Sequence, residues 1–310
     1  MGMGFGFGKV ILFNEHFVVY GIPAIASAIG AKTTALVEKR VGSGAEIIDE
    51  RPETEGYKAE KLAQQKESLD RMLKFMNIDI EHNAFRITLG GDLIAASGVG
   101  ASAASCAAIA RAFSSELGLN YSDEKVNEIA YEGEKGYHGT PSGIDNTAAT
   151  FGGLIWYKRD GASQLMERMR LQKPVEIVMG NTGIVADTRI VVGGVKERRD
   201  KEPEKYASIF RNAERLVQDA RKQLEGFNLE RLGNCMNANH ALLQEIGVSC
   251  PELDSLVDFA RDNGAMGAKM TGTGKGGYMV ALTPGKELQK QVADAIERKG
   301  FQVIRTTIGA

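Results

Sequence analysis

The sequence predicts an α+β protein of two domains, and three observations lead to this prediction. The chain has 310 residues, which is enough for two modest domains that share one cleft. In its first half, a strand at residues 85–89, a glycine-rich loop and an alanine-rich helix reaching Gly118 follow one another. From Lys173 onward the pattern changes to strands separated by helices, which indicates an antiparallel or mixed sheet covered on one side.

Composition and charge exclude several classes of partner. The formal net charge is −2, so nothing points to nucleic acid or to an anionic membrane. No apolar run is long enough to span a bilayer, the N-terminus lacks a signal-peptide pattern, and Gly6 stands where a myristoylation motif needs Ser or Thr. The cysteines, Cys106, Cys235 and Cys250, form neither a CxxC motif nor an even set. We therefore expect a cytoplasmic protein with no nucleic-acid or membrane partner.

The first element is a buried strand at residues 10–13, preceded by alternating glycines in residues 4–9. These glycines do not form a nucleotide-binding motif. Val10 stands where a Walker A motif has Ser or Thr, and a dinucleotide fingerprint follows its strand rather than preceding it. Glu15 and His16 come next, between two apolar runs, and are either paired within the core or directed into a cleft.

The next segments lead to the glycine-rich loop. We expect a strand at 24–40, a polar surface loop at 49–56, a helix with its apolar residues between 62 and 76, and the strand at 85–89. The loop itself, Ser97–Ala104, opens directly into the alanine-rich helix. Glycine lets a ligand approach the backbone, and a helix N-terminus offers unpaired N–H groups, so this stretch suits a phosphate. The alternative is a tight turn before a tightly packed helix.

The helix that follows carries a carboxylate on its buried side. Ser122 or Asp123 caps it, and Glu134 extends an apolar stripe through Ala130. A buried carboxylate needs a cation as partner, because an unpaired buried charge is costly. That cation is either a metal ion or a side chain such as Lys135 or Arg111.

A second acidic residue follows a turn. Pro, Ser and Gly within residues 139–143 fix this turn, and Asp145 emerges just after it, before an expected strand at 151–157. A carboxylate held between rigid elements is typical of a catalytic group. The alternative is that Asp145 only caps a helix.

The second half begins with a strand at 175–179, and we place the domain boundary just before it. An apolar turn at 190–192 follows, and then three helices, a second glycine-rich loop at 269–277, a strand, a helix and a last strand. The three helices span 206–224, 232–243 and 253–260. After the loop, the strand spans 278–282, the helix 288–296 and the last strand 301–306.

Three motifs in this order resemble those of the galactokinase, homoserine kinase, mevalonate kinase and phosphomevalonate kinase (GHMP) superfamily, over essentially the whole chain. They are Gly8–His16, Ser97–Ala104 and Lys269–Gly277. The resemblance implies a two-domain GHMP kinase fold. It consists of an N-terminal ribosomal protein S5 domain 2-like α/β domain (residues 1–173) and a C-terminal ferredoxin-like α+β domain (174–310), with the active site in the cleft between them.

Within the superfamily, three segments look typical of the mevalonate kinase branch. They are Gly139–Asn146, Asp187–Arg189 with the valines after it, and Met236–Asp254. This resemblance implies ATP-dependent phosphorylation of the 5-hydroxyl of mevalonate in isoprenoid biosynthesis, with ATP and Mg²⁺ as cofactors and a homodimer as the expected assembly. Two alternatives stay open. One is a sister kinase acting on homoserine or phosphomevalonate, and the other is a retired kinase that senses nucleotide and metabolite.

The resemblance also implies a role for individual residues. Asp145 orients or accepts the proton of the substrate hydroxyl, and Lys9 stabilises the transferring group. Ser102 and Glu134 hold Mg²⁺. The nucleotide phosphates are bound by Ser97, Gly98, Val99, Gly100, Ala101, Ser102, Ala103 and Gly274, and the substrate by Glu15, His16, Thr188 and Gly143.

The chain departs from the superfamily pattern at three positions. Asn14 replaces the usual glycine before Glu-His, Ala101 replaces the first of two serines, and Lys275 replaces a glycine in the third motif. These changes affect a turn near the substrate, one hydroxyl at the phosphate site, and the charge near the expected phosphates.

Overall fold

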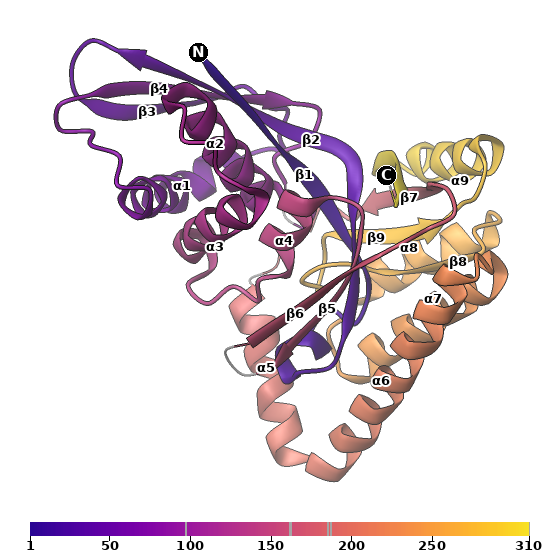
Figure 1. The fold of residues 1–310 in the computed structure, drawn as a ribbon. Coiled ribbons are helices and arrows are strands. Elements are labelled where there is room, and N and C mark those ends of the chain that lie inside the picture. The colour runs from indigo at the N-terminus through magenta and orange to yellow at the C-terminus, as the bar shows by residue number, and fades with distance from the viewer. Residues whose placement is uncertain (97, 161–162, 185, 187, 310) are drawn as a thin grey trace. The chain divides into compact units, whose positions relative to one another are not determined.

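We describe the protein from a computed structural model that covers residues 1–96, 98–160, 163–184, 186 and 188–309. The chain divides into two compact units, each built from more than one stretch of sequence. Unit 1 comprises Met1–Lys9 and Ala28–Gly152, and unit 2 comprises Val10–Ser27 and Gly153–Ala310. Both units combine helices and strands, as predicted (Figure 1). The domain boundary at residues 173 and 174 stays a prediction, while residues 153–173 belong to the same compact unit as the C-terminal half.

Two long strands, β1 and β2, run through both units, and β3 and β4 complete the strands of unit 1. Their bounds are β1 Gly2–Phe13, β2 Ala24–Arg40, β3 Gly44–Asp49 and β4 Ala84–Gly91. Strand β4 pairs antiparallel with β2, with Ile87 opposite Val37, and parallel with β3. The alternation of buried and partly buried residues in β4 is that of a half-buried strand, as the sequence predicts.

The helices of unit 1 pack together. They are α1 Tyr57–Phe75, α2 Ala101–Leu117, α3 Asp123–His138 and α4 Ile144–Phe151. Helix α3 contacts α1, α4 and the alanine-rich helix α2. The sequence did not predict α4. Strand β1 lies against the backbone of α2, because a Cβ added at Gly6 would come within 2.2 Å of the Ala104 carbonyl oxygen. Gly4 and Gly2 make the same approach to Ala108 and Ala112. The glycines of β1 therefore serve strand–helix packing.

Unit 2 contains the remaining elements. They are η1 Phe17–Tyr20, β5 Leu154–Asp160, β6 Ser163–Met169, β7 Val175–Asn181, α5 Thr188–Lys201, α6 Pro203–Glu225, α7 Leu229–Glu245, α8 Pro251–Asp262, β8 Gly267–Met270, β9 Tyr278–Leu282, α9 Lys286–Arg298 and β10 Gln302–Ile308. The strands β10, β7, β9 and β8 lie side by side in that order, and every pair is antiparallel. The core of this unit includes Phe17 and Ile22 from the segment 10–27.

Several sequence-based expectations need correction here. The first strand, expected at residues 10–13 after a run of glycines, begins at Gly2 and contains those glycines. Phe151 ends helix α4, and the strand expected at 151–157 begins at Leu154. Residues 190–192, expected as an apolar turn, lie in helix α5, which buries Val191 and Val195 one turn apart. The polar segment at 49–56, expected as a surface loop, contains a buried side chain, Arg51, of which 5% is exposed. In the part of the chain that the structure describes, the helices are too short or too polar to cross a bilayer.

Candidate functional site

The glycine-rich loop of unit 1 leads into α2 with its helix N-terminus uncapped. Gly98 and Gly100 both have positive φ angles, of 91° and 73°. Gly100 is the N-cap residue of α2 and has no side chain with which to cap the helix. The N–H groups at the start of a helix have no intrahelical partners, so those of this turn suit an anion. Ser97 lies outside the described residues.

Lys9 lies directly beside this loop. Its backbone N–H donates to the Val99 carbonyl oxygen (2.9 Å), and a Cβ added at Gly100 would come within 2.6 Å of the Lys9 Cγ. The Lys9 side chain is buried, and its Nζ lies 3.2 Å from Oδ1 of Asp145. The close approach at Gly100 requires glycine, so the loop and the lysine are positioned together.

Asp145 stands in the first turn of α4, behind a turn fixed by Gly143. Gly143 is the N-cap of this helix, with φ 91°, and its carbonyl oxygen accepts a hydrogen bond from the Thr147 hydroxyl (2.6 Å). The Asp145 side chain is 28% exposed, so a ligand can reach it while Lys9 holds it from the buried side. This placement suits a group that orients or accepts a proton.

Glu134 is the buried carboxylate of this region, and its environment disfavours charge. Burial and the nearby Asp145 raise its pKa to about 8, although a hydrogen bond from the Ser102 hydroxyl and the Lys9 charge oppose the shift. Its Oε1 atom is buried without a hydrogen-bond partner among the described residues. The side-chain partners considered from the sequence are engaged elsewhere, since Lys135 pairs with Glu132 and Arg111 with Asp123.

Ser102 and Glu134 fit a divalent cation that also binds water and phosphate. An orphaned carboxylate oxygen beside a hydroxyl offers the hard oxygen ligands that Mg²⁺ prefers, and Mg²⁺ takes few protein ligands when phosphates supply others. Among the residues that the structure describes, no three acidic, histidine or cysteine side chains gather closely enough to hold a metal unaided. The site therefore suits Mg²⁺ arriving with a nucleotide.

Unit 2 holds the other predicted residues. Glu15 forms an ion pair with Lys269 (2.5 Å), and both side chains are almost fully buried. The imidazole of His16 is buried beside them, with Nε2 2.7 Å from the Thr273 carbonyl oxygen. Burial, with the Lys269 and Arg198 charges, lowers the His16 pKa to about 4. The imidazole is therefore neutral at pH 7.

The geometry assigns the His16 tautomer. A carbonyl oxygen only accepts hydrogen bonds, so Nε2 carries the proton and donates to Thr273. Nδ1 is then an acceptor, and it is buried without a partner among the described residues. Of Thr188, the structure describes only that it begins α5. Gly274 has φ 80°, and a Cβ there would come within 2.2 Å of the Val248 carbonyl oxygen.

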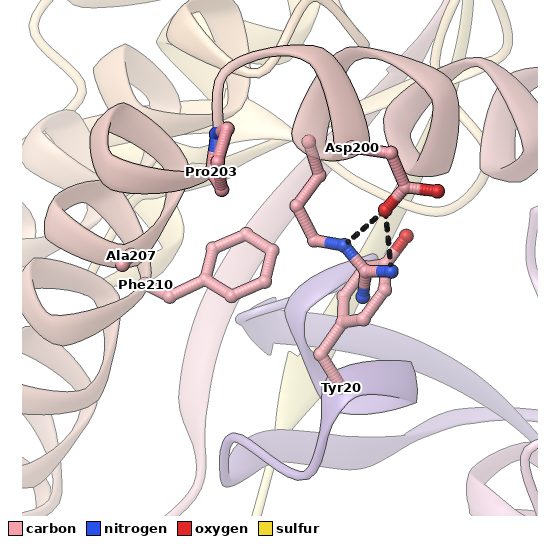
Figure 2. Close-up of a pocket in the computed structure, with 6 residues that line it drawn as sticks. Tyr20, Asp200, Pro203, Ala207 and Phe210 are labelled. Carbon is pink, nitrogen blue, oxygen red and sulfur yellow. Dashed lines mark hydrogen bonds and ion pairs between the residues drawn. The ribbon is translucent and has the colours of Figure 1, made fainter.

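An aromatic cluster fixes the segment that follows His16. The Tyr20 and Phe210 ring centroids lie 5.0 Å apart, Phe17 meets Phe210 edge to face, and the Arg199 guanidinium lies 4.9 Å from the Tyr20 ring centroid. Figure 2 shows Tyr20 and Phe210 facing the same pocket, of about 610 Å³, beside the bend between α5 and α6. These contacts attach η1 to α6 and so help to fix the position of His16.

Two of the three departures from the superfamily pattern, Asn14 and Lys275, have structural explanations. Asn14 has φ 69°, a conformation that favours glycine and tolerates asparagine, and its amide donates to the Pro23 and Ala213 carbonyl oxygens. The exposed Lys275 donates from Nζ to the Ser249 carbonyl oxygen (2.8 Å). Ala101 is buried, and its carbonyl oxygen accepts a hydrogen bond from the Arg51 side chain.

Comparison with known proteins identifies the family. Residues 63–153 match the GHMP kinases N terminal domain, and residues 220–302 match GHMP kinases C terminal. The mevalonate kinase of Pyrococcus furiosus is 36% identical, over 97% of this chain and 94% of the relative. The chain belongs to the GHMP kinase family.

Solved GHMP kinases show the same fold. The crystal structure of L. major mevalonate kinase in complex with R-mevalonate superposes with a TM-score of 0.96 at 40% identity, covering 99% of this chain and 96% of that one. Lactococcus lactis galactokinase, at 20% identity, 100% and 94% coverage and a TM-score of 0.76, shares the fold alone. The superfamily and the two-domain α+β fold predicted from the sequence are confirmed.

Sequence reasoning missed several residues of this GHMP kinase that contact the predicted ones. In the sequence Lys269 marks only the start of a loop and Asn14 only a departure from the motif, although both are buried and Lys269 pairs with Glu15. Arg51 and Tyr137 line a small pocket together with Ser102. The signal in the sequence that could have found Lys269 is a charged residue between Ala268 and Met270 at the start of a glycine-rich loop. Arg51 gives no such signal.

Proposed function

We propose that this GHMP kinase transfers the γ-phosphoryl group of ATP to the 5-hydroxyl of mevalonate, giving 5-phosphomevalonate and ADP. The observation that carries the proposal is the Lys9–Asp145 ion pair beside the glycine-rich loop, in a chain similar throughout to mevalonate kinases. A loop that suits phosphates, with a lysine and a reachable carboxylate next to it, is the arrangement that phosphoryl transfer to an alcohol requires.

In this proposal Asp145 takes the proton of the 5-hydroxyl. The hydroxyl oxygen forms a bond to the γ-phosphorus, the bond from that phosphorus to the bridging oxygen breaks, and ADP leaves with the electron pair. Lys9, buried against Asp145, keeps the carboxylate oriented and stabilises negative charge as it develops on the transferring oxygens.

Residues 98–103 and Gly274 are proposed to bind the nucleotide phosphates, mainly through backbone N–H groups. Ser102 and Glu134 would hold Mg²⁺, which would neutralise phosphate charge when bound. Since Glu134 has a raised pKa without the cation, it would release a proton when the metal binds. A homodimer and a cytoplasmic location stay predictions.

His16 is proposed to accept a hydrogen bond from a hydroxyl group of the substrate. Its free acceptor, Nδ1, cannot bind a carboxylate, which has no proton to donate at neutral pH. Glu15 and Thr188 are proposed to support this recognition in unit 2, and Gly143 to shape the site in unit 1. Recognition through a hydroxyl favours a polyol acid such as mevalonate over an alcohol that lacks a second hydroxyl.

Turnover with Mg-ATP tests the proposal, with mevalonate, homoserine, phosphomevalonate and galactose offered separately. We expect kcat/KM for mevalonate to exceed that for each other alcohol by at least about 100-fold, since even a pocket that discriminates by shape alone reaches about this ratio. Preference for another alcohol would assign a sister kinase. Nucleotide binding without any transfer would assign a sensor.

A further inference from the structure

The buried guanidinium of Arg51 joins three elements of unit 1. Its Nε and Nη2 donate to the two oxygens of Asp49, at 2.9 and 2.6 Å, in a bidentate pair. Its Nη1 donates to the Thr33 hydroxyl and to the Ala101 carbonyl oxygen, both at 3.2 Å. Strand β3 ends at Asp49, Thr33 lies in β2, and Ala101 is the first residue of α2.

The surroundings of this ion pair hold it in a single arrangement. The exposed fractions of the Arg51 and Asp49 side chains are 4% and 10%. Burial alone would raise the pKa of Asp49, yet hydrogen bonds and charge from Arg51 hold it below its usual value. Lys58, from the first turn of α1, donates to the backbone carbonyl oxygens of both partners. A bidentate arginine–carboxylate pair has a defined geometry, so the guanidinium is a fixed point.

The contact with Ala101 lies at the first residue of the alanine-rich helix. Ala101 follows Gly100, the uncapped N-cap, and precedes Ser102, which bonds to Glu134. Its carbonyl oxygen accepts hydrogen bonds from Arg51 and from the Ser105 hydroxyl. Arg51 and Ser102 also line one small pocket. A shift of this carbonyl would move the neighbouring N–H groups and Ser102 with it.

Arg51 is suited to support the loop rather than to bind a phosphate itself. A guanidinium has five N–H donors, and four hydrogen bonds to Asp49, Thr33 and Ala101 engage four of them. We propose that Arg51, fixed by Asp49, is a positioning residue that holds the first turn of α2 in the geometry that binds nucleotide phosphates. This inference rests on the proposed phosphate role of residues 98–102.

The test compares two arginine variants. Arg51→Met removes the guanidinium, and Arg111→Met is the matched control. Arg111 lies in α2 itself, is largely buried, and donates to the Phe5 and Thr150 carbonyl oxygens and to Asp123, all away from the loop. Binding of a fluorescent ATP analogue with Mg²⁺ and no alcohol, together with amide hydrogen exchange over residues 98–105, supplies readouts that do not depend on turnover.

We expect Arg51→Met to weaken nucleotide binding at least tenfold, and to accelerate exchange in the first turn of α2. Arg111→Met should leave the nucleotide Kd within about twofold of the wild type, even if its melting temperature falls. Equal nucleotide binding by Arg51→Met and wild type would overturn the inference, and so would an equal loss in both variants.

A second variant covers the case in which Arg51→Met does not fold. Arg51→Lys keeps the charge but cannot form the bidentate pair and reach Ala101 together. We expect it to fold and to bind nucleotide about three- to tenfold more weakly, whereas wild-type affinity would refute the positioning role. Failure of the wild type itself to bind Mg-ATP would instead refute the proposed function, so the two failures are distinguishable.

Discussion

At the scale of single residues, Asp145 carries the clearest consequence for catalysis. Asp145→Asn keeps the shape of the side chain and removes the base, so kcat should fall by about 100-fold or more, the usual contribution of a positioned acid–base group. Nucleotide affinity should change little, because Lys9 and the loop remain. Steady-state kinetics with mevalonate and binding of the ATP analogue measure the two effects.

The control for this prediction is Asp123→Asn. Asp123 also pairs with a cation in unit 1, but its side chain is half-exposed and its partner, Arg111, lies away from the loop. Its kcat should stay at the wild-type value. A kcat of Asp145→Asn within a few-fold of the wild type would exclude Asp145 as the base.

The raised pKa of Glu134 predicts how the free energy of unfolding depends on pH when metal and nucleotide are absent. Its pKa is about 8 in the folded protein against 4.5 ordinarily, so the folded state binds more protons between these values. The contribution of Glu134 to the free energy of unfolding is therefore greatest at low pH, and it falls as the pH rises from about 4.5 to about 8. Each pKa unit corresponds to about 1.4 kcal/mol.

Glu134→Gln removes this pH-dependent cost. At pH 9 the variant should melt several degrees above the wild type, because each kcal/mol of unfolding free energy shifts the melting temperature by about 2–4 °C. The difference in melting temperature should shrink toward pH 5. Thermal melts across this range measure it, with Glu132→Gln, on the same helix and paired at the surface, as the control. A difference that does not change with pH would show that Glu134 is charged throughout.

At the residue scale, sequence patterns pointed to side chains that the structure places close together, while their roles stay predictions. A carboxylate on an apolar stripe and another behind a glycine turn marked Glu134 and Asp145, and the structure brings both close to Lys9. Arg51 could not be found this way. It lies in a polar segment whose composition is typical of surface loops, and only the fold shows that Asp49 and Thr33 surround it.

At the scale of elements, the two ends of α2 allow a matched comparison. Gly100 precedes the helix with φ 73°, and an added Cβ would meet Lys9 at 2.6 Å. Gly118 ends the helix with φ 64°, and an added Cβ would meet nothing within 4 Å. Alanine at either position is strained by its backbone angle, at a cost of about 1 kcal/mol, but only Gly100→Ala also displaces the loop and the lysine.

We therefore expect both alanine variants to lose a few degrees of melting temperature, while only Gly100→Ala loses nucleotide affinity and kcat/KM, each by tenfold or more. Melts, analogue binding and turnover on the same two preparations check this. Equal kinetic losses at both ends would mean that general destabilisation of α2, and not the geometry at Lys9, limits activity.

The elements also show why sequence patterns predicted the fold incompletely. Amphipathic helices such as α6 follow the 3.6-residue period and were predicted closely. Helix α5 was not, because Ile190, Val191 and Val192 have low helix propensity and two glycines follow them. Burial of Val191 and Val195 on one face overrides that preference, and this burial depends on contacts that are distant in sequence.

At the scale of the whole molecule, the chain passes between its two units at residues 9–10, 27–28 and 152–153. Residues 10–27 are therefore part of unit 2, although residues 28–152 separate them from its remainder. They supply Phe17 and Ile22 to its core, and Asn14 donates to Ala213 and accepts a hydrogen bond from Asn239. The predicted boundary at residue 174 would place residues 10–27 in a different domain from the residues whose core they complete.

We predict that a fragment of residues 174–310 does not fold cooperatively, because it loses two buried core side chains and leaves their neighbours exposed to water. Losing a buried aromatic side chain alone costs about 3–5 kcal/mol, a large part of the stability of a typical domain.

A joined chain that keeps the whole of unit 2 is the matched control. Ser27 pairs with Leu154 in an antiparallel ladder, so a loop of about four residues can join 10–27 to 153–310 as a hairpin. Urea denaturation followed by circular dichroism should give a single steep transition for the joined chain and a broad one for 174–310. A steep transition for 174–310 would instead support a domain boundary at residue 174, with residues 10–27 dispensable for its folding.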